Sequence, residues 1–116
     1  MPASPRDAGY LWDIIAAARE IGEFLAGKTY SDFVSNRMLR LAIERDIEII
    51  GEAARRVSAE FRTEHPEVPW AKIVSQRNVI IHEYDELKLG RMWVVATERV
   101  PELIPLLEPL IPSPEE

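Results

Sequence analysis

Three polar side chains at close spacing, Arg77, His82 and Tyr84, are the strongest candidates for chemistry in this sequence. They lie in a segment whose helical spacing gathers one stripe of mostly apolar side chains, namely Trp70, Ile73, Val74, Arg77, Ile80, Ile81 and Tyr84. Arg77 is the charged member of that stripe. Because a lone buried charge costs several kcal/mol or more, the guanidinium must either be paired or line a cleft.

An arginine close to a histidine suits metal-free cleavage of RNA. The ribose 2′-OH is an internal nucleophile, a neutral histidine can take its proton, and a charged histidine can protonate the leaving 5′-oxygen. The planar guanidinium presents a fork of donors to phosphate oxygens and stabilises their growing charge. The products would carry a 2′,3′-cyclic phosphate. From residue types alone, this reaction is one option among several.

The spacing of Arg77 and His82 limits how the two can work together. Residues five apart in a regular helix lie roughly 140° apart around its axis, so the two side chains do not converge easily on one phosphate. Either the helix loosens near His82, or a symmetry-related copy supplies the complementary residue. We prefer a homodimer, with a two-fold axis beside this helix.

Each of these residues also has an ordinary structural interpretation. A histidine at a helix end is more often a partner of the helix dipole or a packed side chain than a catalyst. Tyr84 taken singly is most often a packing aromatic, and Asn78 a hydrogen-bonding neighbour that could help to position a substrate. His65, which precedes a proline, is interpreted as a surface residue.

Amphipathic helices must position the candidate residues. The first is predicted over about 7–26, with Asp7 as N-cap and Gly27 as a left-handed stop. A short extra helical turn follows, where Ser31 and Asn36 can both act as caps.

The longest helix is predicted over about 37–64, because the sequence His65-Pro66 disfavours its continuation. Its apolar stripe consists of Leu39, Ile43, Ile47, Ile50, Ala54, Val57 and Phe61. A second face carries Glu44, Glu48, Glu52 and Arg55 or Arg56, which we interpret as a solvated ladder of weak ion pairs. A small-residue strip (Ala42, Ile49 and Ala53, with Gly51 nearby) would let another helix approach closely, for example that of a second copy.

Two further helices complete the prediction. One covers 70–84, with Pro69 in its first turn, and the other runs from about 87 to 111 across Pro101, which should kink it. The whole chain, 1–116, is predicted to be one all-α domain: an antiparallel four-helix bundle with a core at about 7–111 and an acidic, proline-rich tail at 112–116.

Composition excludes several classes of function. The 116 residues contain no cysteine and two histidines, which removes thiol catalysis and leaves little for a transition-metal centre. We expect no cofactor, no metal and no membrane segment, and a cytoplasmic location. The formal net charge of −6 argues against a wide electrostatic grip on nucleic acid, although not against one small basic cleft.

The segment from Arg77 to Tyr84 resembles the motif of the HepT-like toxins in the HEPN superfamily: an arginine, four residues, a histidine, any residue and a tyrosine. The segments 48–56 and 66–70 are similar to the helix and turn that precede this motif in that family. The resemblance covers nearly the whole chain, from about residue 7 to residue 110, in size and in helix order. Asn78 matches the polar residue that commonly follows the arginine.

The resemblance implies an all-α, HEPN-like homodimeric ribonuclease that acts on tRNA or mRNA as the toxin of a toxin–antitoxin pair. Arg77 and His82 would form a catalytic motif that is composite across the dimer. Tyr84 would be the residue to which a cognate MNT-type nucleotidyltransferase antitoxin adds AMP, placing a bulky anionic group beside the cleft.

Two other interpretations remain open on the sequence. The chain could be a non-catalytic interaction module that holds a nucleotidyltransferase or a nucleotide, because fold alone does not decide function. It could also be a bare structural bundle in which Arg77 and His82 pair with Glu48 or Glu52.

Overall fold

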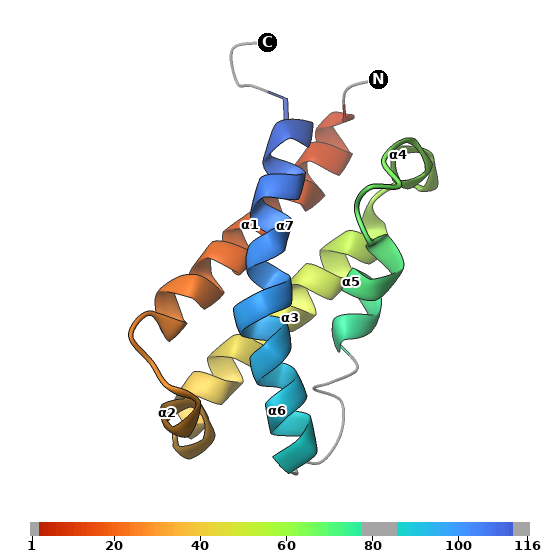
Figure 1. Cartoon of the computed structure of the whole chain (residues 1–116). Helices are drawn as coiled ribbons and strands as arrows, with labels where there is room; N and C mark the ends of the chain where they lie inside the picture. The colour runs from red at the N-terminus through yellow and green to blue at the C-terminus, as the bar shows by residue number, and fades with distance from the viewer. Residues whose placement is uncertain (1–2, 78–85, 113–116) are drawn as a thin grey trace.

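Two long helices, α1 (Pro5–Leu25) and α3 (Arg37–Arg56), pack against each other and form the main seam of the structure (Figure 1). The computed structural model describes residues 3–77 and 86–112. A six-residue helix, α2 (Tyr30–Ser35), reverses the chain between α1 and α3. Figure 1 shows the two long helices running in opposite directions from this corner.

Two short helices and a long, compound one complete the described structure. After α4 (Ala59–Glu64), α5 (Trp70–Gln76) packs on α3. The C-terminal unit packs on α1 and crosses the seam in Figure 1, where it is coloured cyan to blue. It consists of α6 (Glu86–Val94), a π-helical turn η2 (Val95–Arg99), α7 (Val100–Leu107) and a 3₁₀ turn η3 (Glu108–Leu110).

The all-α prediction is confirmed for residues 3–77 and 86–112, which contain no strand. None of the helices in these ranges combines the length and the apolar character that a membrane span requires. The helix predicted over 70–84 is observed as far as Gln76. Arg77 is its C-cap, and the rest of the predicted helix, 78–84, lies outside the described residues.

The core confirms the apolar stripe predicted along residues 39–61, apart from its first member. Along α3 and the residues after it, Ile43, Ile47, Ile50, Ala54, Val57 and Phe61 are all buried, and only Leu39 of the predicted stripe is half-buried. The matching stripe of α1 buries Leu11, Ile14, Ile15, Ala18 and Ile21. Removing a large aliphatic side chain from water contributes roughly 1.5–3 kcal/mol, so these two stripes account for the close packing of α1 on α3.

The predicted helix over 37–64 is wrong in one respect, because the chain breaks after Arg56. Val57 and Ser58 adopt extended backbone, and Ser58 begins α4 by accepting a hydrogen bond on its Oγ from the Phe61 N–H at 3.2 Å. The buried carboxylate of Asp7 holds the break in place. It accepts bonds from the N–H and the hydroxyl of Ser58 at 2.9 and 2.7 Å.

Two predicted helix caps are also corrected. Asp7 is not the N-cap of α1, because Ser4 takes that role and accepts a bond from the Asp7 N–H at 3.1 Å. Thr29, not Ser31, caps α2 through a reciprocal capping box. The Asn36 cap of α3 and the left-handed Gly27 after α1, with a φ of +73°, are confirmed.

The kink expected at Pro101 takes the form of a π-helical turn in the preceding residues. The Val100 N–H bonds to the Val95 carbonyl, one residue further back than in an α-helix. Proline has no N–H to offer the carbonyl four residues earlier, and a wider turn accommodates that loss. The Thr97 hydroxyl donates to the Trp93 carbonyl at 2.7 Å within the same region.

A buried carboxyl group lies in the seam between α1 and α3. Asp46 is 3% exposed, and its Oδ2 has no hydrogen-bond partner among the described residues. Burial, followed by the hydrogen bond and the negative charge of Glu20, raises the pKa of Asp46 to about 7. In the unfolded chain this group has a pKa near 3.8, so the folded protein holds the proton more tightly.

We therefore expect Asp46 to make the protein less stable as pH rises from about 4 through about 7, because the group ionises in the unfolded chain over this range while the fold keeps it protonated. Asp46→Asn stays neutral and should remove this part of the pH dependence, giving a higher unfolding midpoint than wild type at pH 8 and a similar one at low pH. Thermal unfolding at pH 5 and pH 8 measures it. The exposed Glu23→Gln on α1 is the control, and equal pH profiles for Asp46→Asn and wild type would contradict the assignment.

Candidate functional site

Arg77 lies at the C-cap of α5, a helix that two buried side chains hold against the rest of the protein. Ile73 is fully buried, and Trp70 is 7% exposed, with its indole N–H donating to the His65 carbonyl at 2.9 Å. Side chains four and seven residues before Arg77 thus fix the face that the helix presents. The Arg77 side chain is 40% exposed, so it lines a surface and is not buried in the core.

Gly51 of α3 is the surface on which the Arg77 side chain rests. A Cβ atom at position 51 would lie 3.3 Å from Arg77 Cδ, 3.4 Å from Arg77 Cβ and 3.5 Å from the Val74 carbonyl oxygen. A glycine is needed here for close approach, not for an unusual backbone conformation, since Gly51 is an ordinary helical residue. The close approach predicted for the small-residue strip is therefore made, at Gly51, by α5 of the same chain.

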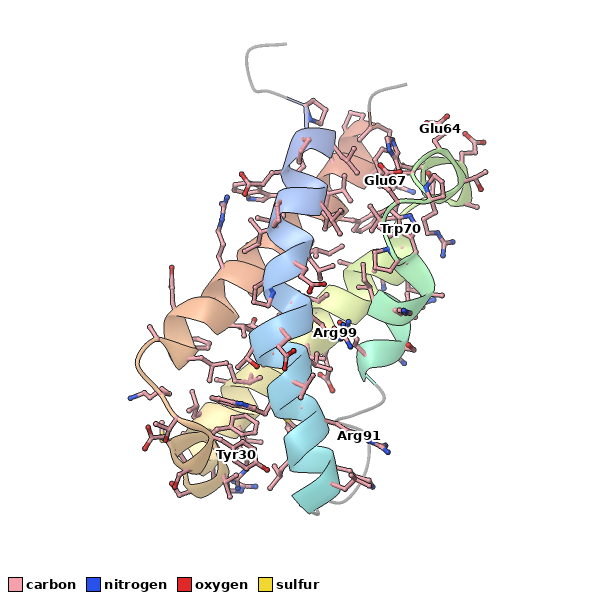
Figure 2. The ribbon with its side chains drawn as sticks, viewed as in Figure 1. Tyr30, Glu64, Glu67, Trp70, Arg91 and Arg99 are labelled. Carbon is pink, nitrogen blue, oxygen red and sulfur yellow. The ribbon has the colours of Figure 1, made fainter. Side chains whose placement is uncertain are left out.

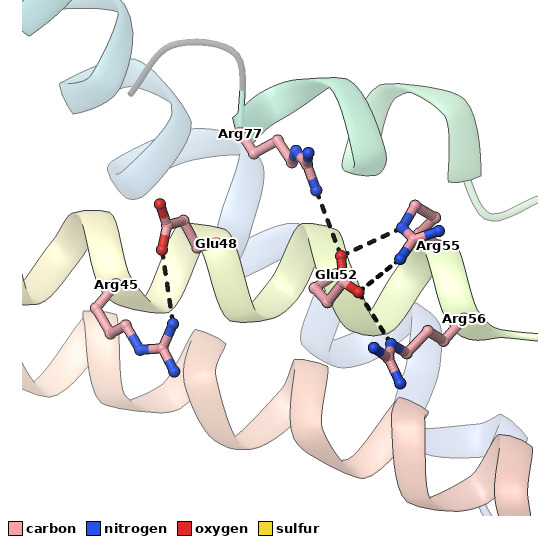
Figure 3. A network of polar contacts seen from close by, with 6 residues as sticks. All are labelled: Arg45, Glu48, Glu52, Arg55, Arg56 and Arg77. Atoms are coloured by element: carbon pink, nitrogen blue, oxygen red, sulfur yellow. Dashed lines mark hydrogen bonds and ion pairs between the residues drawn. The ribbon is translucent and has the colours of Figure 1, made fainter. Parts of the chain in front are cut away.

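The carboxylate of Glu52 gathers three guanidinium groups (Figure 3). Arg55 binds it through two nitrogens, Nε to Oε2 at 3.2 Å and Nη2 to Oε1 at 2.7 Å. Arg56 Nε donates to Oε1 at 2.9 Å, and Arg77 Nη1 reaches Oε2 at 3.4 Å. Hydrogen bonds from Arg55 and then Arg56 lower the pKa of Glu52 to about 2, so the carboxylate is ionised at neutral pH.

The contact from Arg77 is the longest of the four contacts to Glu52. Both side chains are well exposed, at 40% and 38%, and solvent weakens such pairs. The structural-bundle interpretation, which pairs Arg77 with Glu48 or Glu52, is right about Glu52. Glu48 instead faces Arg45 at 3.6 Å. The guanidinium of Arg77 is thus held beside Glu52 but keeps N–H donors that a phosphate could bind.

Arg77 forms part of the wall of a cleft of about 500 Å³ between α1 and α3. The lining residues are Tyr10 and Asp13 from α1, Arg45, Glu48, Ile49, Glu52, Ala53 and Arg56 from α3, and Arg77. Three arginines and three carboxylates balance in charge, so the cleft is neutral in a protein of net charge −6. The sequence analysis did not single out Tyr10 or Asp13, because only the packing of α1 on α3 brings them beside Arg77.

The other three predicted site residues, Asn78, His82 and Tyr84, lie outside the described residues. The convergence of Arg77 and His82 therefore stays a prediction. His65 is less exposed than predicted: its side chain is 21% exposed, its ring packs on Phe61 at 4.4 Å, and Nδ1 lies 3.1 Å from Glu67 Oε2. Within 3–77 and 86–112, no three His, Asp or Glu side chains are grouped so that they could hold a metal ion.

Comparison with known proteins shows the family to which the chain belongs. The model of the family described as "Ribonuclease HepT-like" matches residues 14–110. The chain is 39% identical to "Putative RNase MJ1380" of Methanocaldococcus jannaschii over 86% of this chain and 93% of that protein. It is 34% identical to "Probable ribonuclease HepT" of Thermococcus cleftensis over 81% of this chain and 86% of that protein.

A third relative, "Putative RNase TTE0752" of Caldanaerobacter subterraneus subsp. tengcongensis, is 36% identical over 81% of this chain and 84% of that protein. No solved structure gives a significant match. This chain belongs to the HepT-like ribonuclease family, and the resemblance noted in the sequence is confirmed.

The Gly51 contact yields a direct test. Gly51→Ala should push the Arg77 side chain away by a few tenths of an ångström. If Arg77 has the catalytic role that the sequence predicts, ribonuclease activity should fall roughly tenfold, because small displacements of a catalytic group are costly. Stability should change little, since the helix propensity of alanine, worth roughly 0.5–1 kcal/mol, offsets the crowding.

Gly22→Ala is the matched control, because a Cβ at this helical glycine meets nothing within 4 Å. That variant should be stabilised by roughly 0.5–1 kcal/mol and keep full activity. Cleavage rates and urea unfolding of both variants measure the difference. Equal activities of Gly51→Ala and Gly22→Ala would show that the contact does not position Arg77.

Proposed function

We propose that this protein is a metal-independent endoribonuclease that cleaves RNA by attack of the ribose 2′-OH. The observation that carries the proposal is the state of Arg77. The chain belongs to a ribonuclease family, and the half-exposed guanidinium of Arg77 lies beside a cleft. The side chain of Arg77 rests on Gly51, and its contact with Glu52 is long, at 3.4 Å. A phosphate can displace the weakly bound Glu52 carboxylate from Arg77 at a small cost in free energy.

In the proposed reaction Arg77 binds the non-bridging oxygens of the scissile phosphate and stabilises the charge that grows on them. A neutral His82 takes the proton from the 2′-OH as the 2′-oxygen bonds to phosphorus. A protonated histidine gives a proton to the 5′-oxygen as the P–O5′ bond breaks. The products are a 2′,3′-cyclic phosphate and a free 5′-OH, and Asn78 helps to hold the substrate.

We propose that the working unit is a homodimer, so that two copies of Arg77 and His82 share one cleft. The five-residue spacing supports this, because a regular helix holds the two side chains far apart in angle. Large apolar side chains left at the surface also support it. Met38 on α3 and Leu87 on α6 are 81% and 64% exposed, and such residues are covered when copies associate.

We further propose that the protein is the toxin of a toxin–antitoxin pair, acting on tRNA or mRNA. A cognate MNT-type nucleotidyltransferase would silence it by adding AMP to Tyr84. Tyr84 lies two positions after His82, and an adenylate there would place a negative charge close to the phosphate-binding arginine. The support is membership of the HepT-like family together with the position of Tyr84 in the motif.

Purified protein should cleave RNA in the presence of EDTA and leave 2′,3′-cyclic phosphate ends. Arg77→Ala and His82→Ala should each lower the rate by at least about a hundredfold, because each removes a group that acts in the transition state. Arg62→Ala, an arginine of α4, is the control that should keep activity. A folded wild-type protein that cleaves no RNA would contradict the proposal and favour the non-catalytic interaction module. Cleavage that EDTA abolishes would contradict the metal-independent mechanism.

Mixing the two inactive variants tests the dimer within the same assay. If each site takes its arginine from one subunit and its histidine from the other, a heterodimer of Arg77→Ala and His82→Ala contains one intact site. Mixing should then restore part of the activity after subunit exchange. A mixture that stays inactive, although exchange is shown by labelled subunits, would place both residues in one subunit.

Co-expression with the neighbouring nucleotidyltransferase, where one is encoded, should add adenylate to the wild-type protein and abolish its cleavage of RNA. Tyr84→Phe should gain no mass under the same conditions and stay active, because it lacks the hydroxyl that would accept AMP. Tyr30→Phe, an exposed tyrosine of α2, is the control that should still be modified. Intact-mass measurement separates these outcomes, and adenylate on Tyr84→Phe would show that another residue is the acceptor.

A further inference from the structure

The cleft beside Arg77 holds one charged side chain that has no partner within residues 3–77 and 86–112. Among its described lining residues, Glu52 binds Arg55, Arg56 and Arg77, and Glu48 faces Arg45. Asp13 lines the same cleft from α1, is exposed, and makes no hydrogen bond or ion pair with any residue in the described ranges. An unpaired carboxylate at the wall of a cleft is an available hydrogen-bond acceptor.

Tyr10 provides a second surface in the cleft. Its ring packs partly against the core and is half-buried, so part of it remains in the cleft. Its hydroxyl lies by Arg56, whose pKa is raised first by the hydrogen bond to Glu52 and then by Tyr10. Arg56 is therefore occupied on both sides, whereas the Tyr10 ring and the Asp13 carboxylate remain for a ligand.

We propose that this cleft holds one nucleotide of the RNA strand, next to the phosphate that Arg77 binds, and that Asp13 selects a base with an exocyclic amino group. This inference rests on the proposed ribonuclease function and adds the substrate preference of the same site. The volume of about 500 Å³ lies within the usual range for a pocket that takes a small molecule. Unpaired bases of RNA are commonly recognised by stacking on an aromatic ring and by hydrogen bonds to their edges.

The chemistry of Asp13 determines which bases fit. An ionised carboxylate accepts hydrogen bonds and donates none, so it pairs with the amino group of cytosine, adenine or guanine. Uracil presents a carbonyl oxygen where cytosine has its amino group, and hypoxanthine does the same in place of adenine. These oxygens would face the carboxylate without a proton between them, and the strand would bind less well.

The test uses short RNAs in which one ribose keeps its 2′-OH and the others are 2′-O-methylated. The base on each side of the single cleavable bond is varied between cytosine and uracil, and between adenine and hypoxanthine. At the nucleotide that occupies the cleft, wild type should show a kcat/KM about tenfold higher for the base with an amino group. A tenfold preference is the discrimination expected from one good base contact. Asp13→Asn, whose amide both donates and accepts, should bring that ratio close to one.

Two further variants complete the test. Glu23→Gln removes another exposed carboxylate of α1 and should keep the wild-type ratio. Tyr10→Ala should raise KM about tenfold for every base through lost stacking, whereas Tyr10→Phe, which keeps the ring, should not. Equal rates on the paired substrates for wild type, or the same ratio in Asp13→Asn as in wild type, would overturn the proposal.

Binding of fully 2′-O-methylated strands, which cannot be cleaved, separates this proposal from the proposed function. If wild type cleaves no RNA but binds the cytosine strand better than the uracil strand, and Asp13→Asn loses that preference, the nucleotide site stands and the ribonuclease proposal fails. If strands bind without a preference, the nucleotide site fails. Binding of cytidine monophosphate that depends on Asp13, with an unchanged cleavage ratio, would assign the cleft to a free nucleotide and would also overturn the proposal.

Discussion

The sharing of one carboxylate among three guanidinium groups is the interaction on which the site depends. Arg55 and Arg56 occupy Glu52 at 2.7–3.2 Å and keep it ionised, which leaves the longer contact of 3.4 Å for Arg77. Without Glu52, three like charges would repel one another around the end of the cleft. With it, Arg77 is kept in place but not neutralised fully. A substrate phosphate can therefore take over a position that the carboxylate already defines.

The elements around this carboxylate are arranged so that a seven-residue helix can present an arginine accurately. So short a helix is not stable alone, and α5 depends on the burial of Trp70 and Ile73 against the rest of the protein. Gly51 then lets the stem of Arg77 lie directly on the backbone of α3. The link from Asp7 to Ser58 connects the start of α1 to the end of α3, and the cleft lies along the same two helices.

Features that depend on local periodicity could be predicted from the sequence, and features that depend on distant contacts could not. The stripes of α1 and α3, the stop at Gly27 and the cap at Asn36 follow from nearby residues alone. The break after Arg56 follows from Asp7, which is 51 positions from Ser58, so the unbroken apolar stripe concealed it. In the same way, Arg77 stood out by its place in a motif, but Asp13 and Tyr10 join it only through the packing of α1 on α3.

The charge of the protein supports the proposal that RNA is recognised at a single nucleotide site. With a net charge of −6, the protein as a whole repels a phosphate backbone, so a long electrostatic track cannot supply the affinity. The cleft itself is neutral, because its arginines and carboxylates balance. In the proposed complex, binding comes from close, directional contacts: one guanidinium on one phosphate, one ring against one base, and one carboxylate on one amino group. Such contacts favour cleavage at a particular site over general degradation, because they depend on the identity of the base as well as on the charge of the phosphate.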